Sequence, residues 1–487
     1  MGLNNFFFIV QFVILFIFLS VLQIIRSKWL LEDIGRVQIF ILLFYSYYFV
    51  GSVNWRFAVC VALVTIIAYG GGQLIERAKQ LGKPSQKVRK IAICVWGGVI
   101  LILVYFKYMN FFIESANKVI GLNIGTLKII LPIGISFFTF SALSYVIDVY
   151  RGICDAEKNI VDFGVYMAFF PKITAGPIVR WTEFKPQLKK YRGIKLDSLS
   201  TGIQIFVFGL FKKMVLADHL GVFVDDVFRT PEAFNTGTVV LSAISYSLQI
   251  YLDFSGYSDM AIGLAKILGF EFKANFNLPY LSRGFSDFWS RWHISLSQWF
   301  RDYLYIPLGG CRKGEQRTYI NLLIIMFISG LWHGAGWTFI LWGLLHGIAS
   351  CATRFIKKSK GNQGIDTSSA ITRIIEAIVT FVFATLFWTI FRAESIEKVG
   401  IYWKALFTVH SGISQPYIWT FISVICVGIA TIIAIVRAYK HKNKEINGFY
   451  PIFDLSKVWS LIIFFTFCGL TILLGYYGNT AFIYGAF

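Results

Sequence analysis

The sequence predicts an all-α polytopic membrane protein with about ten transmembrane helices, re-entrant or half-helices, and an interfacial amphipathic helix. Three observations indicate this fold class. Hydrophobic residues make up 56% of the 487 residues, and charged residues only 15%, against roughly 25% in an ordinary soluble domain. The mean hydropathy is +0.64. The basic residues lie in short loops between apolar runs. This composition excludes a disordered chain and a soluble multi-domain enzyme.

The excess of basic residues reflects topology. The chain has 46 Lys and Arg against 26 Asp and Glu, a net charge of +20. Nucleic-acid binding is one explanation of such a charge, but cytoplasmic loops of membrane proteins carry the same excess. We therefore expect the chain to contact the lipid bilayer and no nucleic acid. The seven cysteines show no metal-type spacing, so no metal site is predicted.

The apolar runs alternate with charged loops, which gives each run a direction. The first run, Phe6–Ile25, has no Lys or Arg before it and no small-residue cleavage site after it. It therefore predicts a transmembrane helix rather than a cleaved signal peptide. Loops 76–90, 180–195 and 437–444 are basic and are expected on the cytoplasmic side, which puts both termini outside the cell membrane. The other expected spans are residues 37–53, 57–74, 91–112, 129–150, 202–215, 239–252, 371–391, 418–436 and 458–477.

Two stretches do not behave like plain spans. Residues 160–180 are short and are interrupted by two prolines and a glycine, which indicates a re-entrant element or half-helix. Residues 319–352 contain no Asp, Glu, Lys or Arg and have a basic loop on each side, which predicts a helical hairpin. Its turn falls in SGLWHGAGW, where three glycines loosen the helix. His333 is therefore expected deep in the membrane.

His333 is the leading candidate for chemistry. An ionisable side chain inside the bilayer is costly, so it is a functional candidate by default. Trp332 and Trp337 lie close to it in the sequence. A neutral imidazole in a dry pocket can take a proton from a hydroxyl group, which is the role of a general base. The alternative is a structural histidine that hydrogen-bonds a carbonyl group across the helix bundle.

His293 lies in a segment with an amphipathic helical pattern. Residues 285–303 place aromatic and leucine side chains on one face, while three serines, His293 and Arg301 recur on the other. The pattern predicts an interfacial helix. On such a helix, a solvated histidine is the alternative to a catalytic one.

For the other ionisable residues, the sequence predicts a structural role or leaves several roles open. Asp253 and Asp259 stand at the mouth of an expected span, where they could orient a base, pair with an arginine or cap a helix. His346 ends an apolar arm, where packing or an interfacial hydrogen bond is expected. No nucleotide-binding or serine-hydrolase motif is evident. The remaining histidines lie in expected loops and are set aside: His219, His410 and His441.

Four motifs carry a resemblance to a known family. In chain order they are FFPKITAGPIVR, LDFSGYSDMAIGLAKILGFEF, NFNLPYLSRGFSDFWSRWHISLSQWFRDYLYIPLGG and ISGLWHGAGWTFILWGLLHG. They resemble the membrane-bound O-acyltransferase family, and within it the membrane subunits of bacterial alginate and peptidoglycan O-acetyltransferases. The motifs run from about Phe169 to Gly347, and the three spans that follow also fit this subgroup.

The resemblance implies an O-acyltransferase that takes part in polysaccharide modification. In this subgroup, an acetyl group from cytoplasmic acetyl-CoA passes through a membrane-embedded tunnel to a hydroxyl group outside. The acceptor is a cell-surface polysaccharide or a secreted partner acyltransferase, and no bound cofactor is implied. The family's invariant histidine corresponds to His333 and its second histidine to His293. We expect His333 to activate the hydroxyl, and His293 to position a substrate or share the proton.

The resemblance also suggests substrate-binding residues and a division of the chain. The residues are Trp332, Trp337, Asp253, Arg291 and Arg301. The family often has two arginines before the Trp-His pair, whereas here Ser290 precedes Arg291, which leaves a second charge in doubt. The expected divisions are N-terminal transmembrane helices in 1–150, the catalytic core with its tunnel in 151–352, and C-terminal transmembrane helices in 353–487.

Two alternative functions are open at this point. D-alanyl transferases of teichoic acid share the two histidine motifs but tend to be shorter after the second one. The donor of a D-alanyl transferase is a carrier protein that also presents a thioester. The sequence therefore does not decide between this donor and acetyl-CoA. A glycan or lipid transporter would fit the span count and the basic loops, but the absence of internal repeats and of paired intramembrane acids counts against it.

Overall fold

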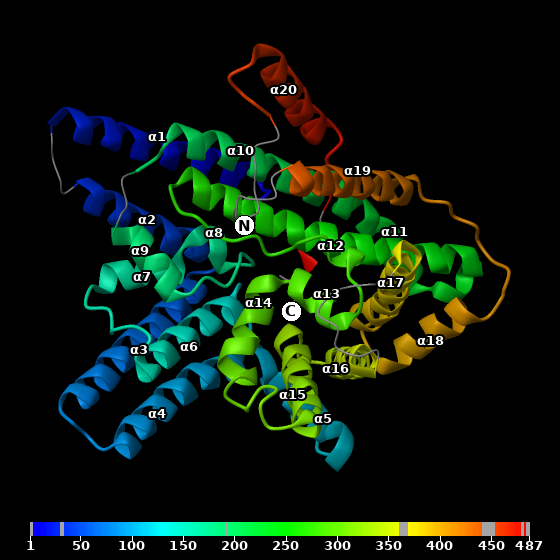
Figure 1. The fold of residues 1–487 in the computed structure, drawn as a ribbon, viewed down its shortest axis with the longest axis horizontal. Coiled ribbons are helices and arrows are strands. Elements are labelled where there is room, and N and C mark those ends of the chain that lie inside the picture. Colours follow the sequence, from blue (N-terminus) through cyan, green and yellow to red (C-terminus); the bar gives the residue numbers. More distant parts are fainter. Residues whose placement is uncertain are drawn as a thin grey trace. The chain divides into compact units, whose positions relative to one another are not determined.

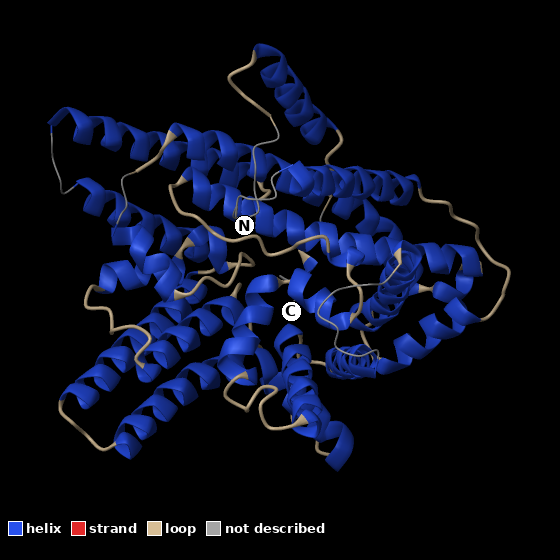
Figure 2. Cartoon of the chain, in the orientation of Figure 1, coloured by secondary structure: helices blue, strands red, loops and turns tan. Residues whose placement is uncertain are grey.

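The computed structural model describes residues 3–29, 34–189, 193–359, 369–440, 453–478 and 482–483. These residues form helices joined by loops, and no strand occurs among them (Figures 1 and 2). The predicted all-α class is therefore confirmed. Parts of the predicted basic loops, residues 190–192 and 441–444, lie outside the described residues, as does His441.

The chain divides into two compact units. The first unit comprises Met1–Phe206 and Ser258–Lys273, and the second comprises Val207–Tyr257 and Ala274–Phe487. The elements of the first unit are α1 Phe6–Trp29, α2 Ile34–Gly51, α3 Trp55–Gln80, α4 Ser85–Leu103, η1 Val104–Tyr108, α5 Met109–Ile120, α6 Ile135–Arg151, α7 Ile160–Ala168, α8 Phe170–Ile173, α9 Trp181–Lys189 and most of α10 Leu196–Leu210.

Helices α3, α4 and α6 pack against one another in the first unit, and α2 packs against α3 and α7. Small residues allow the close approach of α3 and α6. A Cβ atom at Gly72 would lie 2.7 Å from the hydroxyl oxygen of Tyr145, which is fully buried. Interfaces between membrane helices are typically enriched in such small residues, because they let backbones approach closely.

The predicted break in residues 160–180 is present. Helix α7 begins after Asn159, whose side chain accepts hydrogen bonds from the N–H groups of Val161 and Asp162. It ends at Ala168, and the four-residue α8 follows with Pro171 in its first turn. Both elements are buried almost throughout. Non-helical backbone at membrane depth is tolerated only where protein covers it or water fills a cavity, which agrees with this burial.

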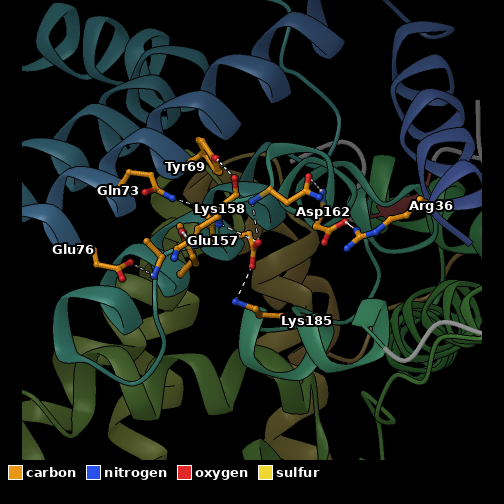
Figure 3. A network of polar contacts seen from close by, with 11 residues as sticks. Arg36, Tyr69, Gln73, Glu76, Glu157, Lys158, Asp162 and Lys185 are labelled. Atoms are coloured by element: carbon orange, nitrogen blue, oxygen red, sulfur yellow. Dashed lines mark hydrogen bonds and ion pairs between the residues drawn. The ribbon is translucent and has the colours of Figure 1, made fainter. Parts of the chain in front are cut away.

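A polar network holds the loop before α7 (Figure 3). The Glu157 carboxylate accepts hydrogen bonds from the N–H groups of Lys158 and Asn159, at 3.0 and 2.9 Å, and pairs with Lys185 at 2.7 Å. Burial alone would raise the pKa of Glu157, but the ammonium and the N–H groups outweigh it and bring the pKa below its ordinary value. Neighbouring contacts of the network are Tyr69 with the Lys158 carbonyl, Gln73 with the Glu157 carbonyl, Glu76 with the Ala156 N–H, and Arg36 with Asp162.

The second unit contains the rest of the helices. They are η2 Phe211–Ala217, α11 Asp218–Arg229, η3 Pro231–Ala233, most of α12 Thr236–Ile267, η4 Pro279–Leu281, α13 Phe285–Arg291, α14 Ile294–Phe300, η5 Arg301–Tyr305, α15 Glu315–His333, α16 Trp337–Ser359, α17 Ala370–Arg392, α18 Ile396–Phe407, α19 Ile418–Lys440 and α20 Val458–Leu473.

The predicted hairpin in residues 319–352 is confirmed as helices α15 and α16, which pack along each other. Glycines make this approach possible. A Cβ at Gly343 would lie 2.3 Å from the carbonyl oxygen of Met326, and one at Gly330 would lie 2.3 Å from that of Phe339. The turn between the helices falls at residues 334–336, directly after His333. The depth of this turn in a membrane stays a prediction.

Three predictions from the sequence are wrong. The amphipathic segment is not one helix: α13 ends at Arg291, and α14 begins only after His293, whose φ of +43° breaks the helical path. Asp253 does not cap a helix, because it lies inside α12, which continues without a break to Ile267. His219, expected in a loop, lies in α11. The amphipathic pattern continues across His293 and therefore does not show the break.

Six helical segments among the described residues are long and apolar enough to cross a membrane. They are Phe6–Ile25, Trp55–Gln80, Ser85–Ile120, Leu196–Arg229, Trp337–Ser359 and Ala370–Arg392, and shorter apolar helices occur at Ile418–Ile433 and Val458–Leu473. The chain is thus a multi-pass membrane protein. The total of about ten crossings and the side on which each loop lies stay predictions from the charge pattern.

Candidate active site

Three buried histidines of the second unit alternate with two tryptophans. The order is His293, Trp332, His333, Trp342 and His346, and each ring contacts the next. The ring centroids are separated by 5.8, 4.9, 4.9 and 4.6 Å along this row. All five side chains are at most 4% exposed. We call these five residues the histidine row.

His333 occupies the middle of the histidine row. It is the last residue of α15 and is 2% exposed. The rings of Trp332 and Trp342 meet its imidazole edge to face from two sides, and Phe391 of α17 contacts it at 5.6 Å. Such ring contacts fix the plane of an imidazole and add no charge near it. The helix end gives His333 its position, because the chain turns away at Gly334.

His293 is fully buried, so the alternative of a solvated histidine is wrong. It stands between α13 and α14 in the left-handed backbone region, which costs a non-glycine residue about 1–3 kcal/mol. Its Nδ1 lies 3.3 Å from Oδ1 of Asn275, and the ring of Phe254 meets it edge to face at 4.8 Å. A buried, strained histidine beside Trp332 is typical of a functional position.

The expected substrate-binding residues are not all gathered in the histidine row. Trp332 belongs to it, whereas Trp337, the first residue of α16, is 56% exposed. The Arg291 side chain pairs with Asp287 at 2.8 Å, and Arg301 pairs with the adjacent Asp302 at 2.7 Å. The ring that faces His333 from α16 is therefore Trp342, five residues beyond the tryptophan that the sequence suggested.

Asp253 takes part in a buried ion-pair cluster. The Lys213 ammonium lies 2.6 Å from a carboxylate oxygen of Asp253 and 2.6 Å from one of Asp218. All three side chains are at most 4% exposed. The second oxygen of Asp253 accepts a hydrogen bond from the N–H of Ile483, at 2.9 Å. Asp253 thus holds a lysine and a C-terminal segment, and its predicted substrate contact stays untested.

Three residues of this region were missed in the sequence, each for a physical reason. Trp342 lies four residues before His346 on one face of α16, but an apolar arm without other polar residues does not indicate where that face points. Asn275 lies 18 positions before His293 and meets it only through folding. Lys213 lies within the expected span 202–215, and its acidic partner Asp253 is 40 positions away in the sequence.

The geometry supports proton transfer in a dry site. Imidazole is the side chain that accepts and returns protons near neutral pH, and three such groups lie in one aromatic row. The indole N–H of Trp342 is buried, and the described residues offer it no acceptor. Among the described residues, no cluster of His, Cys, Asp and Glu could hold a metal ion. The row can therefore supply bases and hydrogen-bond donors from its own side chains.

Comparison with known proteins identifies the family. The sequence profile of the membrane-bound O-acyltransferase (MBOAT) family matches residues 155–393, which include the whole histidine row. A probable alginate O-acetylase AlgI of Pseudomonas putida is 41% identical over 377 residues, which cover 77% of this chain and 75% of that protein. The chain belongs to the MBOAT family. It is an O-acyltransferase, and the resemblance found in its motifs is confirmed.

Two other relatives are named for acceptors other than alginate. A peptidoglycan O-acetyltransferase of Helicobacter pylori is 38% identical over 323 residues, which cover 61% of this chain and 60% of that protein. A teichoic acid D-alanyltransferase of Bacillus subtilis is 27% identical over 273 residues, which cover 54% of this chain and 69% of that protein. The identity is higher with the two acetyl-transferring relatives than with the D-alanyl-transferring one.

Proposed function

We propose that this MBOAT protein transfers acetyl groups for the O-acetylation of a cell-surface or secreted polysaccharide. Its relatives at about 40% identity are named as alginate and peptidoglycan O-acetyltransferases, which favours acetyl as the acyl group and a polysaccharide as the acceptor. The donor is a cytoplasmic thioester, acetyl-CoA. The observation that carries the proposal is the buried His333, fixed between two tryptophans at the end of α15.

His333 acts as the general base in this proposal. Its imidazole takes the proton of the acceptor hydroxyl while the hydroxyl oxygen attacks the carbonyl carbon of the thioester. When the tetrahedral intermediate collapses, the C–S bond breaks, and the thiolate leaves with the proton from the imidazolium. His293 also contacts the Trp332 ring and positions a substrate. No charge on the protein changes over the full cycle.

The Trp342 indole is our candidate for stabilising the negative charge that develops on the thioester oxygen. Its ring lies 4.9 Å from that of His333, and its N–H has no acceptor among the described residues. A preorganised donor in a water-excluded site is worth more than one in water, because it needs no reorganisation during the reaction. Trp332, Asp253, Arg291 and Arg301 remain proposed substrate contacts, with Trp337 the least supported because of its exposure.

The acyl group reaches the outer side of the membrane through the core of residues 151–352, which the family match overlaps. We propose that a separate extracytoplasmic acyltransferase completes the transfer to the polysaccharide. The support is the topology of the charge pattern, which leaves only short loops and the two termini outside. The proposed location is the plasma membrane.

The test compares cells that carry the intact chain, no chain, or His333→Ala. Their surface polysaccharides are treated with mild alkali, and the released acids are identified by mass. Acetate that appears only with the intact chain is the expected result. His333→Gln is the matched variant, because an amide keeps the size of the side chain and can hydrogen-bond but cannot act as a base.

A D-alanyl transferase is the second candidate, favoured by the Bacillus subtilis relative. In the same experiment, it would release D-alanine in place of acetate, with the same dependence on His333. If the three strains release the same acids, the acyl-transfer proposal fails for that host. Transport of a glycan or lipid, which needs no covalent modification, then becomes the leading account.

A further inference from the structure

We propose that Asn275 is a positioning residue that fixes the tautomer of His293. In this assignment, the proton sits on Nδ1 and the lone pair on Nε2. His293 then accepts a hydrogen bond from the acceptor hydroxyl and does not donate one to the thioester oxygen. The assignment rests on the proposed function for its catalytic meaning, but the tautomer itself can be tested without any acyl transfer.

The identity of the Asn275 oxygen follows from its partners. Oδ1 accepts hydrogen bonds from the backbone N–H of Ser295 at 3.1 Å and from the Ser295 hydroxyl at 2.9 Å. A backbone N–H can only donate, so the atom that faces it is the carbonyl oxygen and not the amide nitrogen. The same oxygen lies 3.3 Å from Nδ1 of His293. Because an amide oxygen cannot donate, Nδ1 must carry the hydrogen of this contact.

The backbone holds Asn275 and His293 in this arrangement. The carbonyl of Asn275 accepts a hydrogen bond from the N–H of Ile294 at 2.9 Å. The main chain and the side chain of Asn275 therefore both bind the start of α14. The carbonyl of His293 accepts from the N–H groups of Leu296 and Ser297, each at 3.0 Å. Asn275 is 2% exposed. These bonds stabilise the positive φ of His293, which places the imidazole off the axis of both helices.

Aromatic rings restrict the imidazole further. Phe254 meets it edge to face at 4.8 Å, and Trp332 meets it at 5.8 Å. The rings of Phe254 and Trp332 and the hydrogen bond at Nδ1 give the imidazole a defined plane and a defined protonated nitrogen. The nitrogen opposite Nδ1 is then an acceptor, and the group that satisfies it is a donor. In an acyl transfer, the hydroxyl of the incoming acceptor is such a donor, whereas the thioester carbonyl is not.

This assignment separates the two histidines of the site. His333 removes the proton during attack, while His293 orients the hydroxyl beforehand. A bound histidine is commonly oriented by the group that hydrogen-bonds its other nitrogen. Asn275 has that role here through a neutral amide, which sets the tautomer without adding a charge.

The direct test is the nitrogen chemical shifts of His293 in the full chain, labelled with ¹⁵N-histidine and reconstituted in lipid nanodiscs. The His293 signals are assigned by their loss in His293→Gln. We expect a protonated Nδ1 and an unprotonated Nε2 in the native protein. In Asn275→Ala, we expect both tautomers to appear. A protonated Nε2 in the native protein, or shifts unchanged in Asn275→Ala, would overturn the proposal.

The kinetic test uses the released acetate with three variants. Asn275→Ala is expected to lower kcat by about 10-fold to 100-fold, below the full 10²–10⁴ of general acid–base catalysis, because the base itself remains. Asn275→Asp restores part of the rate, because its carboxylate accepts the same hydrogen bond. That carboxylate favours the imidazolium, so the acid limb of the rate profile moves to higher pH. Asn277→Ala is the matched control, since Asn277 is exposed and two positions away.

The two proposals fail in distinguishable ways. If the nitrogen shifts show the expected tautomer but no variant or native chain transfers acyl groups, the proposed function is wrong and the tautomer stands. If Asn275→Ala lowers only the amount of folded protein, and the rate per folded molecule and its pH profile stay unchanged, Asn275 is a structural residue and this inference is wrong.

Discussion

The loop before α7 in the first unit and the histidine row in the second unit hold their buried ionisable groups in different ways. In the first unit, Glu157 forms an ion pair with Lys185 at 2.7 Å. Asp162 forms one with Arg36 at 2.6 Å. In the second unit, the three imidazoles of the histidine row contact aromatic rings instead. A carboxylate in an ion pair ties its loop to the partner residue. Its lone pairs are then occupied and do not take part in proton transfer. An imidazole held by ring edges has a fixed position without a neighbouring charge.

The second unit also contains its own ion-pair cluster, at Lys213, Asp218 and Asp253, so it uses both arrangements. The difference therefore concerns role rather than location. Glu157 and Lys213 hold segments together through their ion pairs, whereas the imidazoles of the histidine row are available for chemistry. Variants of each kind should change different quantities, which the following predictions use.

The largest expected effect is on catalysis. His333→Ala should lower acetate transfer by at least about 100-fold, because a general base contributes about 10²–10⁴ to the rate. Glu157→Gln should change it by less than about twofold. The measurement is released acetate divided by the amount of chain in the membrane fraction. Equal losses in both variants would contradict the division into chemical and anchoring groups.

The next effect is on stability. Lys213→Met leaves two buried carboxylates without their ammonium, and breaking a buried pair costs about 3–5 kcal/mol. Thermal unfolding in detergent micelles should show a large fall in Tm. The control is Lys266→Met in the first unit, because its pair with Glu271 is partly exposed and exposed pairs contribute about 0–1 kcal/mol. A similar Tm change in both variants would show that burial of the cluster does not increase its contribution to stability.

Two tryptophans of α16 give a third comparison. Trp342→Ala opens a cavity beside His333, and removal of a large aromatic ring from a packed core costs about 3–5 kcal/mol. Trp342→Phe keeps most of that packing and removes the indole N–H, so we expect near-native unfolding with a lower acetyl-transfer rate. Trp337→Ala should alter both quantities little, since this ring is 56% exposed. A larger loss of rate in Trp337→Ala than in Trp342→Phe would return Trp337 to the substrate site.

The smallest effect is the pH dependence of the Glu157 pair. The pKa of Glu157 lies below 4.5 in the folded protein, so the pair stabilises the fold fully above about pH 4.5. That contribution is lost as the pH falls through the folded pKa. We expect the Tm difference between the native chain and Glu157→Gln to be constant above this pH and to shrink below it. This Tm difference should be smaller than that of Lys213→Met, because Lys185 is partly exposed and solvent screens the pair. A difference that grows on acidification would contradict the pairing.

Much of the fold could be predicted because its signals are local. The hairpin of α15 and α16 follows from an uncharged stretch with glycines in the middle, and the break near Pro171 follows from proline and glycine alone. His333 could be found because its position at the hairpin turn is a property of that same stretch.

The rest depends on contacts between distant residues or on backbone strain. The pairing of Asn275 with His293 spans 18 positions, and that of Lys213 with Asp253 spans 40. No periodicity connects such residues. The break at His293 interrupts a regular amphipathic pattern, and hydrogen bonds to the distant Asn275 help to stabilise it.

The ion-pair cluster depends on the number of residues in the π-helical segment Phe211–Ala217 as well as on their charges. A π-helical turn accommodates an additional residue within a helix. Deleting one residue from it would restore the α-helical hydrogen bonds and remove the wide turn in which Lys213 stands. Lys213 would then no longer lie beside Asp218 and Asp253, although every charged side chain was still present. At this position, a substitution changes one contact, whereas a deletion changes the hydrogen-bond pattern of the helix.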